Sequence, residues 1–368
     1  MTGAGIAIPL MRPQLPDADA LMPYLKEIDS NRWYSNFGPL ERRFEARLAA
    51  HFGLGERQVV CVANGTQALG IALRSEARYP VGYCLMPSFT FAATPHAAVS
   101  AGLEPYFVDV DRESWALEPD SLRELLPRLD GPIAAVVPVA PFGAPIDLAA
   151  WDSFATDTGI PVVIDAAAGF DTAGAGNCPV ILSLHATKVL GIGEGGLVLC
   201  CNKESVERVR AGRNFGFADE RIAKVPGTNA KLSEYLSAVG LAALDSWAQV
   251  RQEFLCRAQL YLEAFDGFEG VRFSPNFGAG SVGSTCNVIL DLPSASAVIA
   301  SLGEDGIEAR RWWNRGCHNE PVFRGCRRTE LPTTEFLGDR VVGLPFYRDL
   351  DIDQINRIRS ALERALNR

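Results

Sequence analysis

The chain of 368 residues is 48% hydrophobic and 21% charged, a composition that excludes an intrinsically disordered protein. Its 35 Lys and Arg stand against 44 Asp and Glu, and the net charge of −9 argues against nucleic-acid binding through a general basic surface. No apolar run reaches the roughly 18 residues of a membrane span, so we expect no membrane association. The nine cysteines are irregularly spaced, which argues against a disulfide framework and indicates a cytoplasmic protein.

Short Val- and Ile-rich runs in the first 250 residues alternate with helical segments, which predicts an α/β fold with a mostly parallel seven-stranded sheet flanked by helices. The expected strands are 58–62, 82–86, 105–108, 133–137, 161–164, 180–183 and 196–200. The expected helices are 39–51, 66–75, 91–101, 147–157 and 203–213, followed by a long pair at 231–247 and 250–265.

The texture of the sequence changes after about residue 266, where Gly and Ser gather in NFGAGSVGST. The elements expected beyond it are a strand at 286–290, a helix at 294–302, a strand at 308–312 and a closing helix at 352–366. We therefore expect two domains. The large one covers residues 1–248 and includes the N-terminal segment, and a smaller C-terminal α+β domain covers residues 249–368.

The strongest chemical signal lies between residues 162 and 196. The buried run VVIDAAAGFD places Asp165 at the carboxyl end of a strand, where open α/β sheets bind ligands. In SLHATKVLGIGEGG, Lys188 lies among apolar residues beside a glycine-rich loop, and such surroundings lower the pKa of a lysine and make it a nucleophile. The two residues together suit pyridoxal phosphate, whose aldehyde a lysine binds and whose ring nitrogen an aspartate keeps protonated.

A phosphate cradle for this cofactor is predicted where ANGTQAL ends a strand and opens a helix. Gly65 permits close approach, while Thr66 and Gln67 offer a hydroxyl and backbone N–H groups at the helix N-terminus. Ser183 is a further candidate donor, and Phe91 is the candidate aromatic cover for the cofactor ring. Each feature alone has an ordinary structural explanation, so the prediction depends on their order in one α/β layout.

In this order of motifs the chain resembles the DegT/DnrJ/EryC1/StrS sugar aminotransferases, which are pyridoxal-phosphate enzymes of fold type I. The resemblance covers nearly the whole chain, from NRWYSNFGPLERRFEARLAAHFG through ANGTQAL, VVIDAAAGFD and GTNAKLSEYLSAVGLAALD to VVGLPFYRDL. Its most specific part is the pattern Ser183-x-His185-x-x-Lys188 followed by EGG.

The resemblance implies that Lys188 carries the cofactor as a Schiff base, that Asp165 faces the ring nitrogen and that Phe91 stacks on the ring. It matches Asn229 to an asparagine that reaches the cofactor phosphate of the neighbouring subunit, which implies a homodimer with shared active sites. The residues that it assigns to the phosphate are Gly65, Thr66, Gln67 and Ser183.

Ala168 departs from the pattern of the family in a way that affects the chemistry. Family members usually have Gln or His at this position, near the phenolic oxygen of the cofactor, so a hydrogen bond is lost here. Members that replace the lysine with His are dehydratases, and Lys188 argues against that branch.

Two regions are candidates for substrate contacts. Tyr34 and Asn36 precede the helix at 39–51, where the family meets the sugar. His185 faces either the substrate or the core, with equal weight on the two interpretations.

The second region, ARRWWNRGCH, supplies Arg310, Arg311 and His318. Arginines suit a diphosphate, although a packed strand with exposed arginines explains the segment equally well. His318 with Cys317 and Cys326 lacks a second ligand pair at suitable spacing, so we expect no metal site.

Together these features predict an aminotransferase that moves an amino group from glutamate to a keto-deoxy-sugar on a nucleoside diphosphate, in polysaccharide or glycosylated-metabolite biosynthesis. Two alternatives that keep the cofactor stay open: a dehydratase- or epimerase-like outcome, and a non-catalytic sensor. A dinucleotide-dependent oxidoreductase is disfavoured, because GIGEGG precedes an expected strand rather than a helix.

Overall fold

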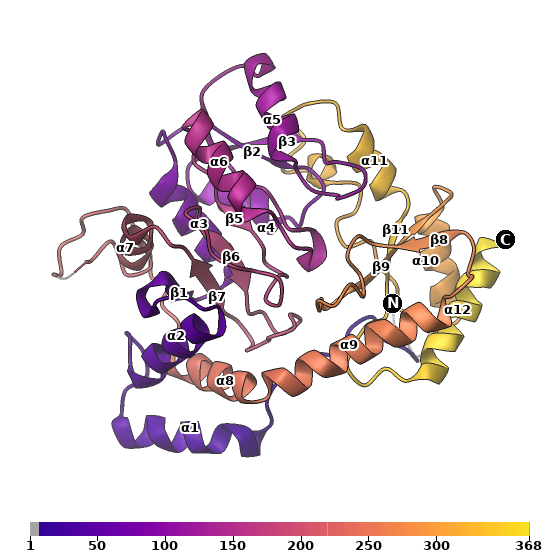
Figure 1. The fold of residues 1–368 in the computed structure, drawn as a ribbon, viewed down its shortest axis with the longest axis horizontal. Coiled ribbons are helices and arrows are strands. Elements are labelled where there is room, and N and C mark those ends of the chain that lie inside the picture. The colour runs from indigo at the N-terminus through magenta and orange to yellow at the C-terminus, as the bar shows by residue number, and fades with distance from the viewer. Residues whose placement is uncertain (1–6, 219, 368) are drawn as a thin grey trace.

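The computed structural model describes residues 7–218 and 220–367. Figure 1 shows a large sheet covered by helices and, at the far end of the long helix α9 (Trp247–Ala264), a smaller sheet packed by C-terminal helices. Within the described part of the chain, no helix is both long enough and apolar enough to cross a membrane.

The large sheet is mostly parallel, as predicted. Its strands are β1 Val59–Val62, β2 Tyr83–Pro87, β3 Glu104–Val108, β4 Ile133–Val136, β5 Ile164–Asp165, β6 Val180–Ser183, β7 Gly196–Leu199 and β10 Arg327–Arg328. Two four-stranded sheets, β1-β7-β6-β5 and β10-β3-β2-β4, are joined because Val163 N donates to Val136 O and Asp165 N to Pro138 O, both at 2.9 Å. Only β7 runs antiparallel to its neighbours.

Both faces of this sheet are buried, which explains its nearly continuous apolar strands. In β1, Val59 and Cys61 belong to one hydrophobic cluster, whereas Val60 and Val62 belong to another on the opposite face. The strand β10, which the sequence did not predict, adds to the edge beside β3. Its two residues are exposed arginines, so the strand lacks the apolar run from which the other strands were predicted.

The predicted helices of the first part of the chain are present, and α1 and α5 are additional. The helices are α1 Ala18–Asn31, α2 Pro39–His51, α3 Gly65–Glu76, α4 Ala93–Ser100, α5 Pro119–Leu125, α6 Leu148–Thr158, α7 Lys203–Gly212 and α8 Glu234–Asp245. Side-chain oxygens accept backbone N–H groups at several helix starts, and the capping residues are Asp17, Asn64, Asp147, Asn202 and Ser233.

The C-terminal region forms a small α+β unit. Its elements after α9 are β8 Val271–Phe273, β9 Cys286–Leu290, α10 Ala295–Glu304, α11 Pro332–Gly338, β11 Val341–Leu344 and α12 Ile352–Leu366. The sheet is antiparallel, in the order β11-β9-β8. The expected strand at 308–312 is wrong: Arg310 makes a single bridge to Gly343, and the indole of Trp312 packs where a Cβ of Gly343 would stand. Arg310 and Gly343 exchange two backbone hydrogen bonds of 3.1 and 2.7 Å, and this one bridge does not extend into a strand.

The N-terminal segment is attached to this C-terminal region. Ile8 bridges Ile307 in parallel, Leu10 N donates to Glu308 Oε2 at 3.0 Å, and both Ile8 and Leu10 are buried. Residues 1–6 lie outside the described part of the chain. The division into domains at residue 248 stays a prediction, and these contacts tie the start of the chain to the part beyond it.

Gly240 of α8 tests how tightly α8 packs on α2. A Cβ at Gly240 would lie 2.4 Å from the ring of Phe44, which is fully buried. We predict that Gly240→Ala lowers the free energy of unfolding by about 1–3 kcal/mol, because the ring has no space to retreat. The control is Gly303→Ala in α10, where a Cβ meets open space. We expect this control to be neutral or to stabilise by up to about 1 kcal/mol. Denaturant unfolding measures both, and equal effects would contradict the packing argument.

Candidate active site

Asp165 ends β5 at the carboxyl edge of the parallel strands and is buried. Its Oδ2 accepts a 2.7 Å hydrogen bond from the hydroxyl of Thr94, and its Oδ1 accepts one of 3.1 Å from Ala167 N. The Thr94 hydroxyl lies 2.9 Å from that of Thr90. Burial raises the pKa of Asp165, while these two donors and the charge of Lys188 lower it. The carboxylate is thus oriented from two sides and suits the role of partner to a cationic ring nitrogen.

Lys188 lies in the loop between β6 and β7, which folds back on itself. Ala186 N donates to Gly193 O at 2.8 Å, and a Cβ at Gly191 would lie 2.6 Å from Ala186 O. The glycine-rich sequence therefore permits the close backbone approach that shapes the loop. Burial lowers the pKa of Lys188, and the nearby charge of Asp165 raises it. A lowered pKa favours the neutral amine that attacks an aldehyde.

Three strand ends meet at the start of α3. Gly196 of β7 pairs with Val62 of β1 on one side and with Ser183 of β6 on the other. A Cβ at Gly196 would lie 2.5 Å from the backbone of Asn64, and one at Gly65 would lie 3.0 Å from the Cβ of Ser183. Glycine at both positions is a packing requirement. It brings Ser183 to a helix N-terminus, which is a site that binds anions.

Thr66 and Gln67 are exposed at this N-terminus. The Asn64 side chain accepts a 2.8 Å hydrogen bond from Gln67 N, so Asn64 caps the helix and already satisfies this N–H group. Phe91 stands just before α4 and is 61% exposed, and its carbonyl accepts from Thr94 N at 3.1 Å. An exposed aromatic ring one turn from the partner of the buried carboxylate is available to cover a cofactor.

The candidate substrate residues His185, Tyr34 and Asn36 are all accessible. The Nδ1 of His185 lies 2.9 Å from Thr187 Oγ1, and the ring is half-exposed. Tyr34 is exposed and stacks on Tyr235, with ring centroids 6.3 Å apart. Asn36 is exposed and left-handed, with φ of 62°.

His318, by contrast, is buried. Its Nδ1 lies 2.7 Å from the hydroxyl of Ser88, and its Nε2 lies 2.8 Å from the side-chain nitrogen of Asn319. Burial is the main cause that lowers its pKa. These contacts are those of a histidine that ties the C-terminal region to the end of β2.

Arg310 and Arg311 lie in the bridged segment beside β11. Arg310 is exposed and lies 3.3 Å from Glu308, and Arg311 donates to the hydroxyl of Ser296 at 2.6 Å. Neither arginine, nor His318, is among the described residues that line the cavity at Lys188.

Asn229 lies beside the cradle of its own chain. Its neighbour Ala230 accepts a 2.8 Å hydrogen bond from Ala63 N at the end of β1, and Asn229 Oδ1 accepts one of 2.6 Å from Lys231 Nζ. Its reach toward a neighbouring subunit stays a prediction.

A cavity of about 580 Å³ opens at the Lys188 loop. Its walls come from residues 11–17, residues 186–191, the junction of α8 and α9, and residues 346–348. The N-terminal wall is fastened by an ion pair of 2.9 Å between Arg12 and Asp349 and by a 3.4 Å hydrogen bond from Arg348 to Gln14 O. Sequence reasoning missed this wall, because residues more than 300 positions apart meet only in the fold.

Sequence reasoning also missed the role of Thr94. A signal was present: Thr90 and Thr94 are four residues apart, directly after a strand and at the opening of a helix, so their hydroxyls share one face.

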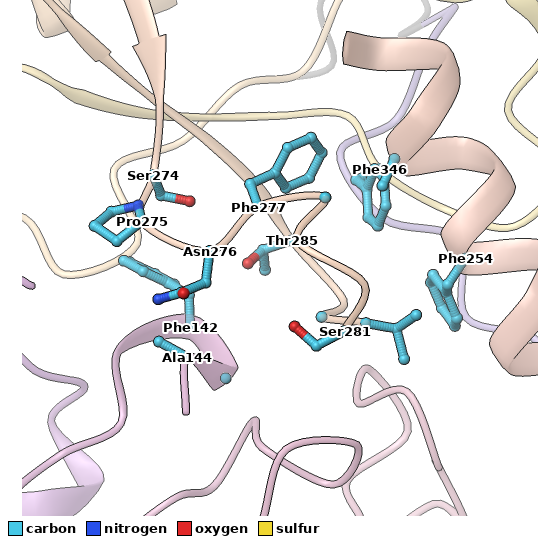
Figure 2. A pocket seen from close by; sticks show the side chains of 15 residues that line it. Phe142, Ala144, Phe254, Ser274, Pro275, Asn276, Phe277, Ser281, Thr285 and Phe346 are labelled. Atoms are coloured by element: carbon cyan, nitrogen blue, oxygen red, sulfur yellow. The ribbon is translucent and has the colours of Figure 1, made fainter. Parts of the chain in front are cut away.

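Figure 2 shows a second, much smaller cavity, with Phe142 on one side and Phe254 and Phe346 on another. Its volume of about 30 Å³ holds about one water molecule, so it is too small for a sugar ring. The Gly- and Ser-rich run 274–285 lines this cavity together with Phe142 of the large-sheet region and Phe254 of α9. The run therefore packs where the C-terminal region meets the rest of the protein. Across the described residues, no group of three or more His, Cys, Asp or Glu side chains is arranged to hold a metal ion.

Residues 17–363 match the DegT/DnrJ/EryC1/StrS aminotransferase family. The chain belongs to this family. The chain is 33% identical to protein Rv3402c of Mycobacterium tuberculosis (strain H37Rv), over 97% of this chain and 90% of the relative. It is 27% identical to the dTDP-4-amino-4,6-dideoxy-D-glucose transaminase of Escherichia coli, over 96% and 98%. The crystal structure of DesI in the presence of its TDP-sugar product superposes with a TM-score of 0.87 at 30% identity, over 99% and 94%.

The predicted fold and cofactor are thereby confirmed. The chain is an aminotransferase of fold type I, and its cofactor is pyridoxal phosphate. The residues present fit this cofactor, since the close approach of Gly65 to Ser183 forms a cradle that a Cβ would fill. The roles of the individual site residues stay predictions.

Thr94→Val tests whether the Thr94 hydroxyl supports the carboxylate of Asp165. Loss of a hydrogen bond to a charged group raises the pKa of Asp165 further and disfavours its ionised form. We predict roughly ten-fold weaker binding of pyridoxal phosphate, measured by titrating the cofactor-free protein. The control is Thr156→Val, whose hydroxyl bonds only the helix carbonyl of Asp152 at 2.9 Å. Unchanged affinity in Thr94→Val would contradict the assignment.

Proposed function

We propose that this aminotransferase moves an amino group from glutamate to a keto-deoxy-sugar carried on a nucleoside diphosphate, in the biosynthesis of polysaccharides or glycosylated metabolites. The observation that carries the proposal is that the buried Asp165 and Lys188 lie at the same edge of the sheet, where each charge affects the pKa of the other, and that Lys188 lines a cavity of about 580 Å³. That volume lies in the range of small-molecule sites. The names of the Escherichia coli transaminase and of the DesI complex support a nucleotide-linked sugar as the acceptor.

The residues of this chain divide the work of binding the cofactor. The N-terminus of α3, with Gly65, Thr66 and Ser183, binds the phosphate, and Lys188 binds the aldehyde in the resting enzyme. Asp165 holds a proton at the ring nitrogen. The cofactor, when bound, supplies an electron sink and an aldehyde through which amines exchange.

Lys188 then acts as the base. Once the amino donor has taken its place on the cofactor, the amine of Lys188 would take a proton from the α-carbon of the donor and return it to the carbon that carried the aldehyde. Burial lowers the pKa of Lys188, so the neutral amine is populated at lower pH than for an exposed lysine. Because the keto-acid product leaves before the acceptor sugar enters, the kinetics are ping-pong.

The proposed substrate contacts are those predicted from the sequence. Tyr34, Asn36 and His185 are exposed or half-exposed, which supports this role. None of the six predicted substrate residues is among the described residues that line the cavity at Lys188. Arg310, Arg311 and His318 have less support, because Arg310 lies beside Glu308, Arg311 donates to Ser296 and His318 is buried.

We further propose a homodimer with shared active sites. The segment after α7 projects from the body of the protein (Figure 1), bridged between Asn214 and Asn229, and it exposes Phe215 and Ile222. Exposed apolar groups on a projecting arm favour burial against a second copy. Light scattering of the holoenzyme tests the proposed homodimer, since its molar mass should be twice that of one chain.

All nine cysteines are free, which supports a location in a reducing cytoplasm.

Lys188→Ala tests the base. We predict loss of turnover by at least about a thousand-fold together with loss of the visible absorbance of lysine-bound cofactor, because the variant lacks the amine that binds the aldehyde and moves the proton. The control is Lys203→Ala at the exposed start of α7, which we expect to keep the activity of the unaltered enzyme. Turnover in Lys188→Ala near that of the unaltered enzyme would overturn the proposal.

A half-reaction screen identifies the acceptor. Glutamate added to the holoenzyme should convert the cofactor to its amine form, and a panel of 3-keto and 4-keto nucleotide sugars should reverse the change for one member. No spectral change with glutamate would contradict the proposal and favour the sensor or dehydratase alternatives that Ala168 suggests.

A further inference from the structure

The loop between α1 and α2, residues 33–38, is held in a strained conformation. Asn36 and Phe37 are consecutive left-handed residues, each with φ of 62°. This backbone conformation is unfavourable for residues other than glycine, so surrounding contacts must hold the two residues in it. Phe37 N donates to Glu41 Oε2 at 3.1 Å, Phe37 O accepts from Arg42 Nε at 2.8 Å, and the guanidinium of Arg213 lies 4.6 Å from the Phe37 ring.

Glu41 is the buried centre of these contacts. Its side chain is 2% exposed, and its second oxygen, Oε1, accepts from Arg213 Nη1 at 3.0 Å. Each oxygen of the carboxylate therefore already faces a donor. Protonation removes the negative charge and occupies one of the acceptor sites, so it weakens the charge-assisted bonds from Phe37 N and Arg213.

Several charged groups surround Glu41 from every element packed against it. They are Arg42 and Glu45 on α2, Arg210 and Arg213 at the end of α7, Lys231 before α8 and Glu234 on α8. The carboxylates of Glu45 and Glu234 repel a charge on Glu41, while Arg213 favours it. Burial, offset in part by Arg213, raises the pKa of Glu41 to about 7.

This cluster also contacts the strand that precedes the cofactor cradle. Arg213 donates to Cys61 O, and Glu45 Oε1 accepts from Cys61 N at 2.9 Å, within β1 and before α3 begins. The loop at residues 33–38 and strand β1 thus contact one set of buried charges.

We infer that Glu41 is a positioning residue, which holds the loop at residues 33–38 ready for the acceptor sugar only while its carboxylate is ionised. The inference rests on the proposed function in that the loop carries the candidate substrate residues Tyr34 and Asn36. It goes beyond that function by assigning a pH-dependent control of acceptor binding to a residue that touches neither substrate nor cofactor.

The first experiment needs no substrate. Hydrogen exchange of the peptide that covers residues 33–38 is measured in the holoenzyme at pH 6 and pH 8, corrected for the intrinsic pH dependence of amide exchange. Ionised Glu41 accepts from Phe37 N, so we expect roughly ten-fold greater protection at pH 8, the ratio for one hydrogen bond to a charged group. Equal protection at the two pH values would overturn the inference.

Glu41→Gln supplies the variant, because an amide cannot ionise and offers one acceptor and one donor side. We expect its loop exchange to be high and the same at both pH values. The matched control is Glu27→Gln on α1, which removes an ion pair of 2.8 Å with Arg43. Arg43 lies on α2, the helix that carries Glu41, and this control should keep the pH dependence of the unaltered protein. A pH dependence that persists in Glu41→Gln would also overturn the inference.

Kinetics complete the test. As pH falls from 8 to 6, the KM for the acceptor should rise several-fold more than kcat changes, and Glu41→Gln should show the raised KM at both pH values. A KM independent of pH in the unaltered enzyme, despite a loop that loosens, would overturn the link to acceptor binding. If no nucleotide sugar is a substrate, the proposed function fails, while the exchange experiment still decides the role of Glu41.

Discussion

The direction of one strand organises the whole site. β7 runs antiparallel between β1 and β6, so the loop that precedes it lies at the same edge of the sheet as the carboxyl ends of its neighbours. Lys188 belongs to that loop, Ser183 ends β6, and the helix with the cradle follows β1. A parallel strand in this position would place the lysine at the opposite edge, about a strand length away. The close approach of Gly65 and Gly196 is what permits the three strand ends to meet.

Burial then decides the chemistry of the two ionisable groups at this edge. Desolvation raises the pKa of Asp165 and lowers that of Lys188, and each charge partly restores the ionised form of the other. The hydroxyl of Thr94 and the N–H of Ala167 add donors to the carboxylate alone. The two donors and the charge of Lys188 thus offset part of the burial that disfavours the Asp165 carboxylate, while burial favours the neutral amine of Lys188. The overall charge of −9 opposes the approach of an anionic substrate, so binding must depend on local groups.

The resemblance and the pattern of apolar runs predicted the large sheet, helix α2 and the family from the sequence. The predictions of strands from apolar runs failed at two segments. The strand expected at 308–312 is a single bridge, in which Arg310 and Gly343 exchange backbone hydrogen bonds. The strand β10 consists of two arginines that pair with β3. The substrate role predicted for His318 from the segment ARRWWNRGCH stays a prediction, and the structure places its ring in the interior between Ser88 and Asn319. The position of a polar side chain relative to the core depends on long-range packing, which local patterns do not encode.

The sequence by itself determined the order of residue types, and a lysine, an aspartate and a glycine-led helix start in that order predicted the reactive groups. Only the tertiary structure decided what surrounds each of them, and among these groups Lys188 is the one that lines the cavity of about 580 Å³ formed by the described residues. The N-terminal wall of the cavity, fastened by Arg12 and Asp349, joins residues from opposite ends of the chain. Likewise, Glu41 reads as an ordinary exposed helix residue, but the fold surrounds it with Glu45, Glu234 and Arg213. Burial and the charges of distant residues set the chemistry of a side chain, and both exist only after folding.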